Sequence, residues 1–144
     1  MGAKYQDAEL ILRLYELRRE SVLRQARNWF LRDFWPTSAE AILEVVRGEH
    51  SAWYRMVTSY WEMAAALVNQ GAIDAEMFNE TNGEHIFLFA KVEPYLADLR
   101  RSYGNPRLMG NLEKLVRSMP NSEQVLKTMR ERQAAMAAAA KSGR

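Results

Sequence analysis

Hydrophobic residues recur at helical spacing along most of the chain, and the pattern is broadest between residues 51 and 70. When this stretch is wound as a helix, its large apolar side chains cover roughly half of the surface. So broad an aromatic and aliphatic face predicts a helix at the centre of a small helical core. The apolar side chains are those of Trp53, Met56, Val57, Tyr60, Trp61, Met63, Ala64, Leu67 and Val68.

The other periodic segments predict further helices around the central one. Residues 7–33 read as one long helix, because Asp7 is a suitable N-cap and no Gly or Pro follows before Pro36. Its charged stripe has mixed signs, as on a solvated face: Arg13, Glu16, Glu20, Arg24 and Arg27. Shorter helices are expected at residues 38–47, 74–82, 84–103, 106–119 and from 122 onward, with a break near Pro94.

These segments predict an all-α fold, a single domain over residues 1–144 with six or seven helices. The chain is long enough to bury a core of its own. The last ~10 residues are expected to fray, because the alanine run has high helix propensity but little to bury.

Composition excludes several classes of protein. Cysteine is absent, which rules out disulfides, thiolate metal sites and cysteine nucleophiles. No apolar run approaches the roughly 18–20 residues of a membrane span, and the N-terminal residues lack the layout of a signal peptide. We therefore expect a cytoplasmic protein with no membrane span.

The charge is unevenly distributed although the net charge is only +2. Residues 36–93 carry three basic and nine acidic side chains, whereas residues 94–144 carry ten basic and four acidic ones. The acidic middle and the basic end can neutralise each other within one molecule or across a dimer. The alternative is a basic surface for nucleic acid or another polyanion, although no helix-turn-helix pattern accompanies it.

A polar stripe on the central helix is the best candidate for a ligand site. Arg55, Glu62 and Asn69 are spaced seven residues apart and so lie on one side of that helix. They can face solvent or line a small-ligand pocket. A third interpretation is a structural ion pair, in which Arg18 or Arg19, within or beside the apolar sector of the first helix, pairs with Glu62.

Four aromatic residues crowd the end of the first helix: Trp29, Phe30, Phe34 and Trp35, just before Pro36. This cluster is typical of a core corner where two helices turn. It is also the kind of aromatic patch found at protein interfaces, so we include it as a candidate interaction surface.

Catalytic and metal-binding motifs are missing. The two histidines, His50 and His85, stand in neither HExxH nor ExxH, and no phosphate-binding loop or nucleophile elbow is present. His85 with Glu80 and Glu84 could bind a metal weakly, but such residues beside Gly83 are more typical of a solvated helix start. We expect no catalytic residue, no metal and no cofactor.

A family resemblance covers roughly residues 51–116. The segment YWEMAAALVNQGAIDAEMF, then Pro94, Gly104 and NPRLMGNLEKL, resembles uncharacterised small all-helical bacterial proteins grouped as domains of unknown function. The resemblance implies a helical bundle and no catalytic residue.

Together these observations favour a helical interaction or scaffold module without enzymatic activity. We expect it to self-associate, with a dimer favoured, through residues 29–35 or the C-terminal helix. The alternatives are a basic-surface binder of nucleic acid or another polyanion, and a small-ligand-binding bundle that uses Arg55, Glu62 and Asn69.

Overall fold

In the computed structural model, which describes residues 2–143, the helices pack around one another in an all-α fold. The described chain contains no strand, as the sequence predicted. The helices are α1 (Gly2–Arg18), α2 (Ser21–Arg32), α3 (Ala39–Arg47), α4 (Ser51–Asn69), α5 (Ala75–Thr81), α6 (Glu84–Val92), the 3₁₀ turn η1 (Glu93–Tyr95), α7 (Leu96–Tyr103), α8 (Gly110–Arg117) and α9 (Ser122–Ser142).

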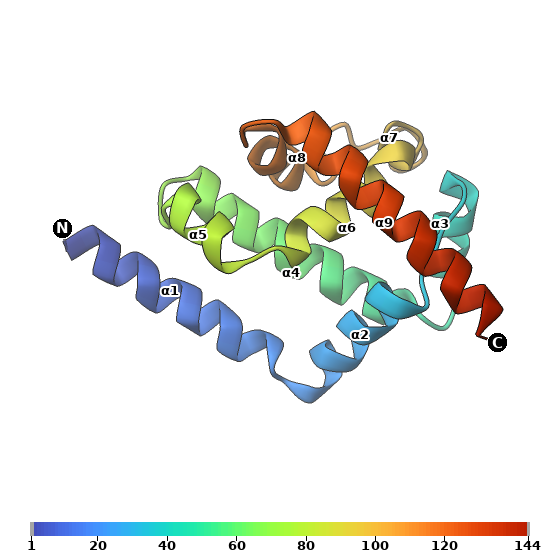
Figure 1. The fold of residues 1–144 in the computed structure, drawn as a ribbon, viewed down its shortest axis with the longest axis horizontal. Helices are drawn as coiled ribbons and strands as arrows, with labels where there is room; N and C mark the ends of the chain where they lie inside the picture. The colour runs from blue at the N-terminus through green and yellow to red at the C-terminus, as the bar shows by residue number, and fades with distance from the viewer. Residues whose placement is uncertain (1, 144) are drawn as a thin grey trace.

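The predicted central helix is α4, and it lies in the middle of the fold. Val57, Trp61 and Ala64 are essentially inaccessible to solvent, and Tyr60 is buried beside them. α2, α3 and α8 pack on α4, while α9 packs on α6 (Figure 1). Met63, expected on the apolar face, is instead 44% exposed, because it lies at the edge that no other helix covers.

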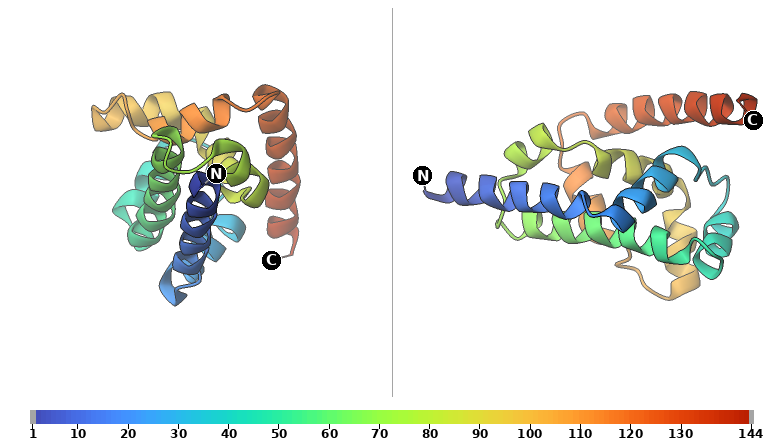
Figure 2. Two further views of the ribbon diagram at one scale, coloured as in Figure 1. Left: turned by 90° about the vertical axis from the view of Figure 1, so that its left-hand side faces the viewer. Right: turned by 90° about the horizontal axis from the view of Figure 1, so that it is seen from below.

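The two long terminal helices lie on the outside of the bundle. α1 runs along one edge and meets α2 at a corner, and α9 crosses the molecule on the other side of α6 (Figures 1 and 2). α9 is helical through Ser142, including the turns that were expected to fray. Two of its side chains bond to backbone carbonyls of α6: Arg130 Nε to Ala90 O at 3.0 Å and Gln133 Nε2 to Phe87 O at 2.8 Å.

The expected single helix over residues 7–33 is wrong, because the chain turns at Arg19 and Glu20. The Glu20 carboxylate accepts a hydrogen bond from Leu23 N at 2.9 Å and so caps a new helix, α2. Asp7 does not cap α1, which begins at Gly2; its carboxylate accepts a bond from Asp74 N at 2.8 Å. Because of this break and the one at Pro94, the predicted number of six or seven helices is slightly too low.

The break predicted near Pro94 is confirmed. α6 ends at Val92, Pro94 lies in η1, and α7 follows directly. Asp74 caps α5 through a bond from Met77 N at 2.9 Å. The helix expected from residue 106 begins only at Gly110, because Met109 adopts the left-handed backbone conformation and residues 105–109 form a turn.

A partly buried ion pair joins α2, α4 and α6. Arg27 NH2 donates to Glu84 Oε1 at 2.7 Å and Arg27 Nε to Glu84 Oε2 at 2.9 Å. Trp61 Nε1 on α4 donates to the same Oε2 at 2.9 Å, and Arg27 NH1 reaches Arg18 O at the end of α1. Arg27 was expected on a solvated face, but the bend at residues 19–20 turns it inward.

Replacing Arg27 is expected to destabilise the fold strongly. Arg27→Ala leaves the largely buried Glu84 carboxylate without its cation, which should lower the free energy of unfolding by about 2–3 kcal/mol. The control is Arg47→Ala, which removes an exposed pair with Glu40 whose two side chains are 66% and 65% accessible. That variant should lose less than about 1 kcal/mol in the same urea titrations. Equal losses in both variants would contradict the structural role of the buried pair.

Candidate functional site

The polar stripe of α4 contacts the start of α8 and does not line a pocket described in the structure. Glu62 accepts bonds from Asn111 N at 3.0 Å, Asn111 Nδ2 at 3.0 Å and Leu112 N at 2.9 Å. Asn69 Nδ2 donates to Asn111 O at 3.0 Å. Arg55 is exposed two turns away and bonds to Ser51. The three residues therefore do not converge on a common ligand position.

The function of Glu62 is to cap a helix that belongs to another part of the chain. The first N–H groups of a helix have no partner within it, and its N-terminus favours negative charge. α8 starts at a left-handed Met109 and has no cap from its own side chains, so the carboxylate of α4 supplies one.

The expected ion pair of Glu62 with Arg18 or Arg19 is replaced by this cap. The guanidinium of Arg18 lies over the rings of Tyr15 and Trp61, 5.0 and 5.6 Å from their centroids, and Arg19 is exposed at the α1–α2 corner. A buried Arg–Glu pair does join the first part of the chain to the centre, but its members are Arg27 and Glu84.

Removing the Glu62 carboxylate is expected to loosen α8. Glu62→Ala should lower the free energy of unfolding by about 2 kcal/mol, because it leaves three N–H donors unpaired. Glu62→Gln is the matched control and should lose less, since its amide oxygen still accepts. Hydrogen exchange at the amides of Asn111 and Leu112 should accelerate in Glu62→Ala. Unchanged exchange there would show that the cap is dispensable.

The aromatic cluster at the end of α2, the candidate interaction surface, lies mostly in the core. Trp29, Phe30 and Phe34 are 8%, 1% and 4% exposed, and Trp35 is half-buried. Trp29 stacks on His50 with ring centroids 5.1 Å apart. An open hollow of about 470 Å³ lies beside these rings, but its aromatic walls are already packed on one another.

The sequence analysis did not identify Lys91, around which this cluster is arranged. Its Nζ donates to Phe30 O at 2.6 Å and Phe34 O at 2.8 Å and lies 3.8 Å from the Trp35 ring centroid. Burial lowers the pKa of Lys91 to about 7. The ammonium satisfies carbonyls at the end of α2, as basic groups do at helix C-termini. The signal in the sequence is a lone lysine within the apolar run IFLFAKV.

His85 lies inside the core and not at a solvated helix start. It is inaccessible to solvent, its Nε2 is 2.9 Å from Asn79 Oδ1, and the rings of Trp61 and Phe78 enclose it. Burial lowers the pKa of His85 to about 4, against an opposing effect of the nearby Glu84. Within residues 2–143, no three His, Cys, Asp or Glu side chains gather in a way that could hold a metal ion.

Acidification should therefore destabilise the protein through His85. Between pH 6.5 and 4 the unfolded chain takes up a proton that the folded chain does not, so the stability falls as the pH falls. The folded pKa of about 4 corresponds to a loss of about 3 kcal/mol by pH 4. His85→Gln removes this contribution, and the difference in unfolding free energy between the two proteins should shrink at low pH. A ring titration near pH 6.5 by NMR would contradict burial.

Four of the ten basic residues of the segment 94–144 are paired with acidic side chains in the part of the chain that the structure describes. Arg100 bonds to Glu113, Arg101 to Asp98, and both Arg117 and Arg130 to Glu93. Arg107 lies in the turn before α8, Lys114 on α8, and Lys127 and Arg132 on α9. The four ion pairs reduce the positive charge that this part of the chain offers to a polyanion.

The apolar surface that remains exposed is concentrated on α1. Tyr5, Leu12 and Tyr15 are 71%, 64% and 51% exposed. With the half-buried Ala8 they follow three- and four-residue steps, so they form one stripe, termed here the α1 flank. Ile11 and Leu14, on a neighbouring side of α1, are buried against the bundle.

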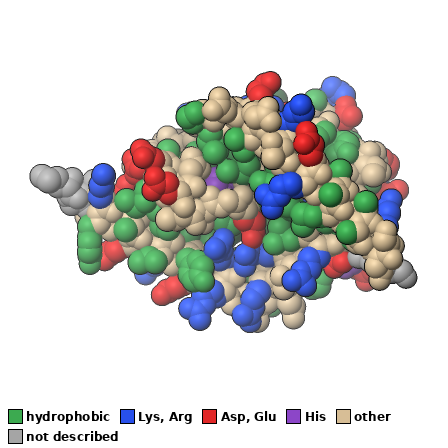
Figure 3. Space-filling view, in the orientation of Figure 1, with side chains coloured by type: hydrophobic (Ala, Val, Ile, Leu, Met, Phe, Trp, Pro, Cys, Tyr) green, Lys and Arg blue, Asp and Glu red, His purple; other side chains and the backbone are tan. Residues whose placement is uncertain are grey.

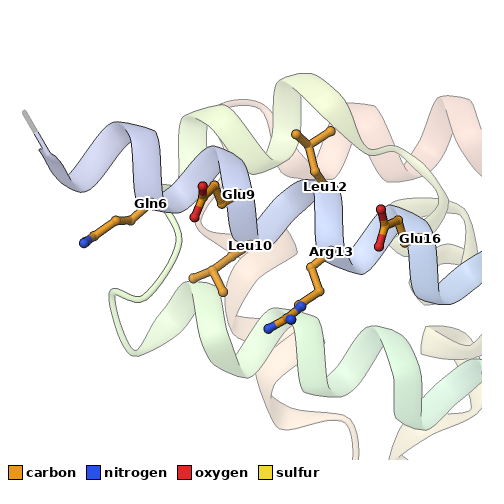
Figure 4. Close-up of a pocket in the computed structure, with 6 residues that line it drawn as sticks. All are labelled: Gln6, Glu9, Leu10, Leu12, Arg13 and Glu16. Carbon is orange, nitrogen blue, oxygen red and sulfur yellow. The ribbon is translucent and has the colours of Figure 1, made fainter.

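A shallow hollow of about 610 Å³ beside the α1 flank does not form a pocket. Its lining residues all come from α1, and Leu12 points away from Leu10 and Arg13 (Figure 4). Glu9 and Glu16 point between the direction of Leu12 and that of Leu10 and Arg13, and they border the flank (Figure 4). Leu12 points toward the side of the molecule on which α5 and α9 lie.

A second apolar feature is a groove between α2, α6 and α9, of about 400 Å³. Its apolar lining is Leu31, Phe87, Met129 and Met136, and Arg132 stands at its rim. Hydrophobic atoms lie between α9 and the α1–α2 corner, where Lys and Arg side chains gather (Figure 3). This groove and the α1 flank are the candidate functional surfaces.

Comparisons with known proteins identify the family but no activity. Residues 4–119 match DUF4760, a domain of unknown function, which covers α1 through α8 and leaves α9 outside. No curated protein and no solved structure matches the chain. None of the helices over residues 2–143 is long and apolar enough to cross a membrane. With most of its length matched, the chain belongs to the DUF4760 family of domains of unknown function.

Proposed function

We propose that this protein is a non-enzymatic helical interaction module that associates with a second copy of itself. The observation that carries the proposal is the α1 flank, on which Tyr5, Leu12 and Tyr15 are more than half exposed. Single exposed apolar residues are ordinary, but a helically spaced stripe of large ones indicates an interaction surface.

The attachment of α1 supports this interpretation. α1 is fixed to the bundle by the buried Ile11 and Leu14, by the Asp74 N–Asp7 bond and by the bond from Tyr60 OH to Leu14 O. These contacts hold the helix in place while leaving its flank uncovered. Because the flank residues already lie on a formed helix, binding costs less conformational entropy than it would for an unfolded segment.

The charges beside the flank favour a copy of the same chain over a strongly charged partner. α1 carries Lys4, Glu9, Arg13 and Glu16 on exposed positions, a mixture of both signs. The apolar residues of α1 supply the favourable free energy of association, since burying a Leu or aromatic side chain contributes about 1.5–3 kcal/mol. Pairing of identical subunits about a two-fold axis is the commonest way in which soluble proteins oligomerise.

The buried polar groups support a role without catalysis. Glu62 caps α8, Glu84 binds Arg27 and Trp61, and Lys91 binds two carbonyls. Groups engaged in this way hold the helices together and are not presented to a substrate.

Substitution on the α1 flank is expected to prevent association. Leu12→Glu places a charge in the proposed interface and should turn the wild-type dimer into a monomer in sedimentation velocity at concentrations up to about ten times the wild-type dissociation constant. The wild-type protein should dimerise with a concentration-dependent sedimentation coefficient.

The matched control is Met63→Glu, which introduces the same charge at an exposed apolar residue of α4. This variant should dimerise like the wild type. A wild-type protein that stays monomeric at high concentration would refute the proposed function, and equal effects of both substitutions would refute the role of α1.

A further inference from the structure

We propose that the α1 flank of one copy docks into the groove between α2, α6 and α9 of the other copy, and the reverse, so that two reciprocal contacts close a two-fold dimer. The inference rests on the proposed self-association and names the two surfaces that meet. The flank and the groove are two exposed apolar features of the same molecule, and each can cover the other.

Both surfaces lie toward the same side of the protein. Leu12 projects from α1 toward the side on which α9 lies (Figure 4), and the groove lies between α9 and the α1–α2 corner. α1 and α9 run in roughly the same direction in two views (Figures 1 and 2). A two-fold rotation perpendicular to this side reverses α1 and sets it antiparallel to α9 of the other copy, alongside the groove.

The groove has an apolar lining that suits the edge of one apolar helix. Leu31 and Phe87 are half-buried, and Met129 and Met136 supply flexible side chains that adapt to the surface placed on them. Tyr5, Leu12 and Tyr15 present the matching large apolar groups. Docking an amphipathic helix by residues spaced three and four apart is a recurring mode of recognition.

Acidic side chains on one edge of the α1 flank complement basic side chains beside the groove. Glu9 and Glu16 border the α1 flank, whereas Arg132 rims the groove and Arg24 lies on the same face of α2 as Leu31, seven residues earlier. All four side chains are exposed. Among the ion pairs of residues 2–143, none involves any of these four residues.

Reversing the charges on each surface gives a sharp test. One variant carries Glu9→Lys and Glu16→Lys, and the other carries Arg24→Glu and Arg132→Glu. Each variant alone places like charges in both contacts of its own dimer, so its dissociation constant should rise about 10-fold or more. An equimolar mixture restores opposite charges in both contacts and should form a heterodimer with near wild-type affinity.

The control variant carries Lys127→Glu and Lys114→Glu, at exposed positions on α9 and α8. Its net charge changes by the same amount as that of the arginine variant. It should dimerise like the wild type, and circular dichroism should confirm that all variants fold. Sedimentation velocity measures the homodimers, and native mass spectrometry of mass-labelled variants measures the mixture.

The outcomes separate this inference from the proposed function. A monomeric wild type would overturn both. A dimer unaffected by either charge reversal would keep self-association and overturn this docking. Loss of the dimer in the α1 variant alone would mean that the flank pairs with another surface, such as a second α1, and two disrupted variants that do not associate when mixed would also overturn the reciprocal contact.

Discussion

The buried carboxylate of Glu84 is the constraint on which the arrangement of the bundle depends. It stands at the first residue of α6, accepts three bonds from Arg27 of α2 and one from Trp61 of α4, and so joins three helices at one point. Through Arg27 NH1 and Arg18 O the same cluster also reaches the end of α1. Because an unpaired charge in the interior is costly, the three helices can pack in few other ways.

Polar side chains from neighbouring elements also bind the ends of other helices. Glu62 caps the start of α8, Lys91 binds carbonyls at the end of α2, and Arg130 binds Ala90 O near the end of α6. Short helices have a large share of unpaired backbone groups, so a bundle built from them needs polar side chains from neighbouring elements. In this protein the buried polar residues fix the positions of the helices.

This use of polar residues bears on function. The side chains that resemble a catalytic or ligand-binding set in the sequence are bonded to the backbone or to one another, and the aromatic cluster of residues 29–35 encloses Lys91. The surfaces left uncovered are apolar: the flank of α1 and the groove that α9 forms with α2 and α6. Since the family match ends at residue 119, α9 contributes one wall of this groove from outside the shared domain.

The sequence by itself determined the fold class, the central helix and several boundaries. Residues 51–70 have a broad apolar face, Pro94 cannot continue a regular helix, and Asp74 caps its own helix, and each of these signals is local. The break at Arg19 and Glu20 escaped prediction because glutamate inside a charged helix carries no signal of a cap. Nor could the sequence show that Glu62 caps α8, since a polar stripe reads the same whether water or a helix terminus faces it. Only the tertiary structure decided the partners of Arg27, Glu62, His85 and Lys91, because a buried charge is defined by the residues that other helices bring to it.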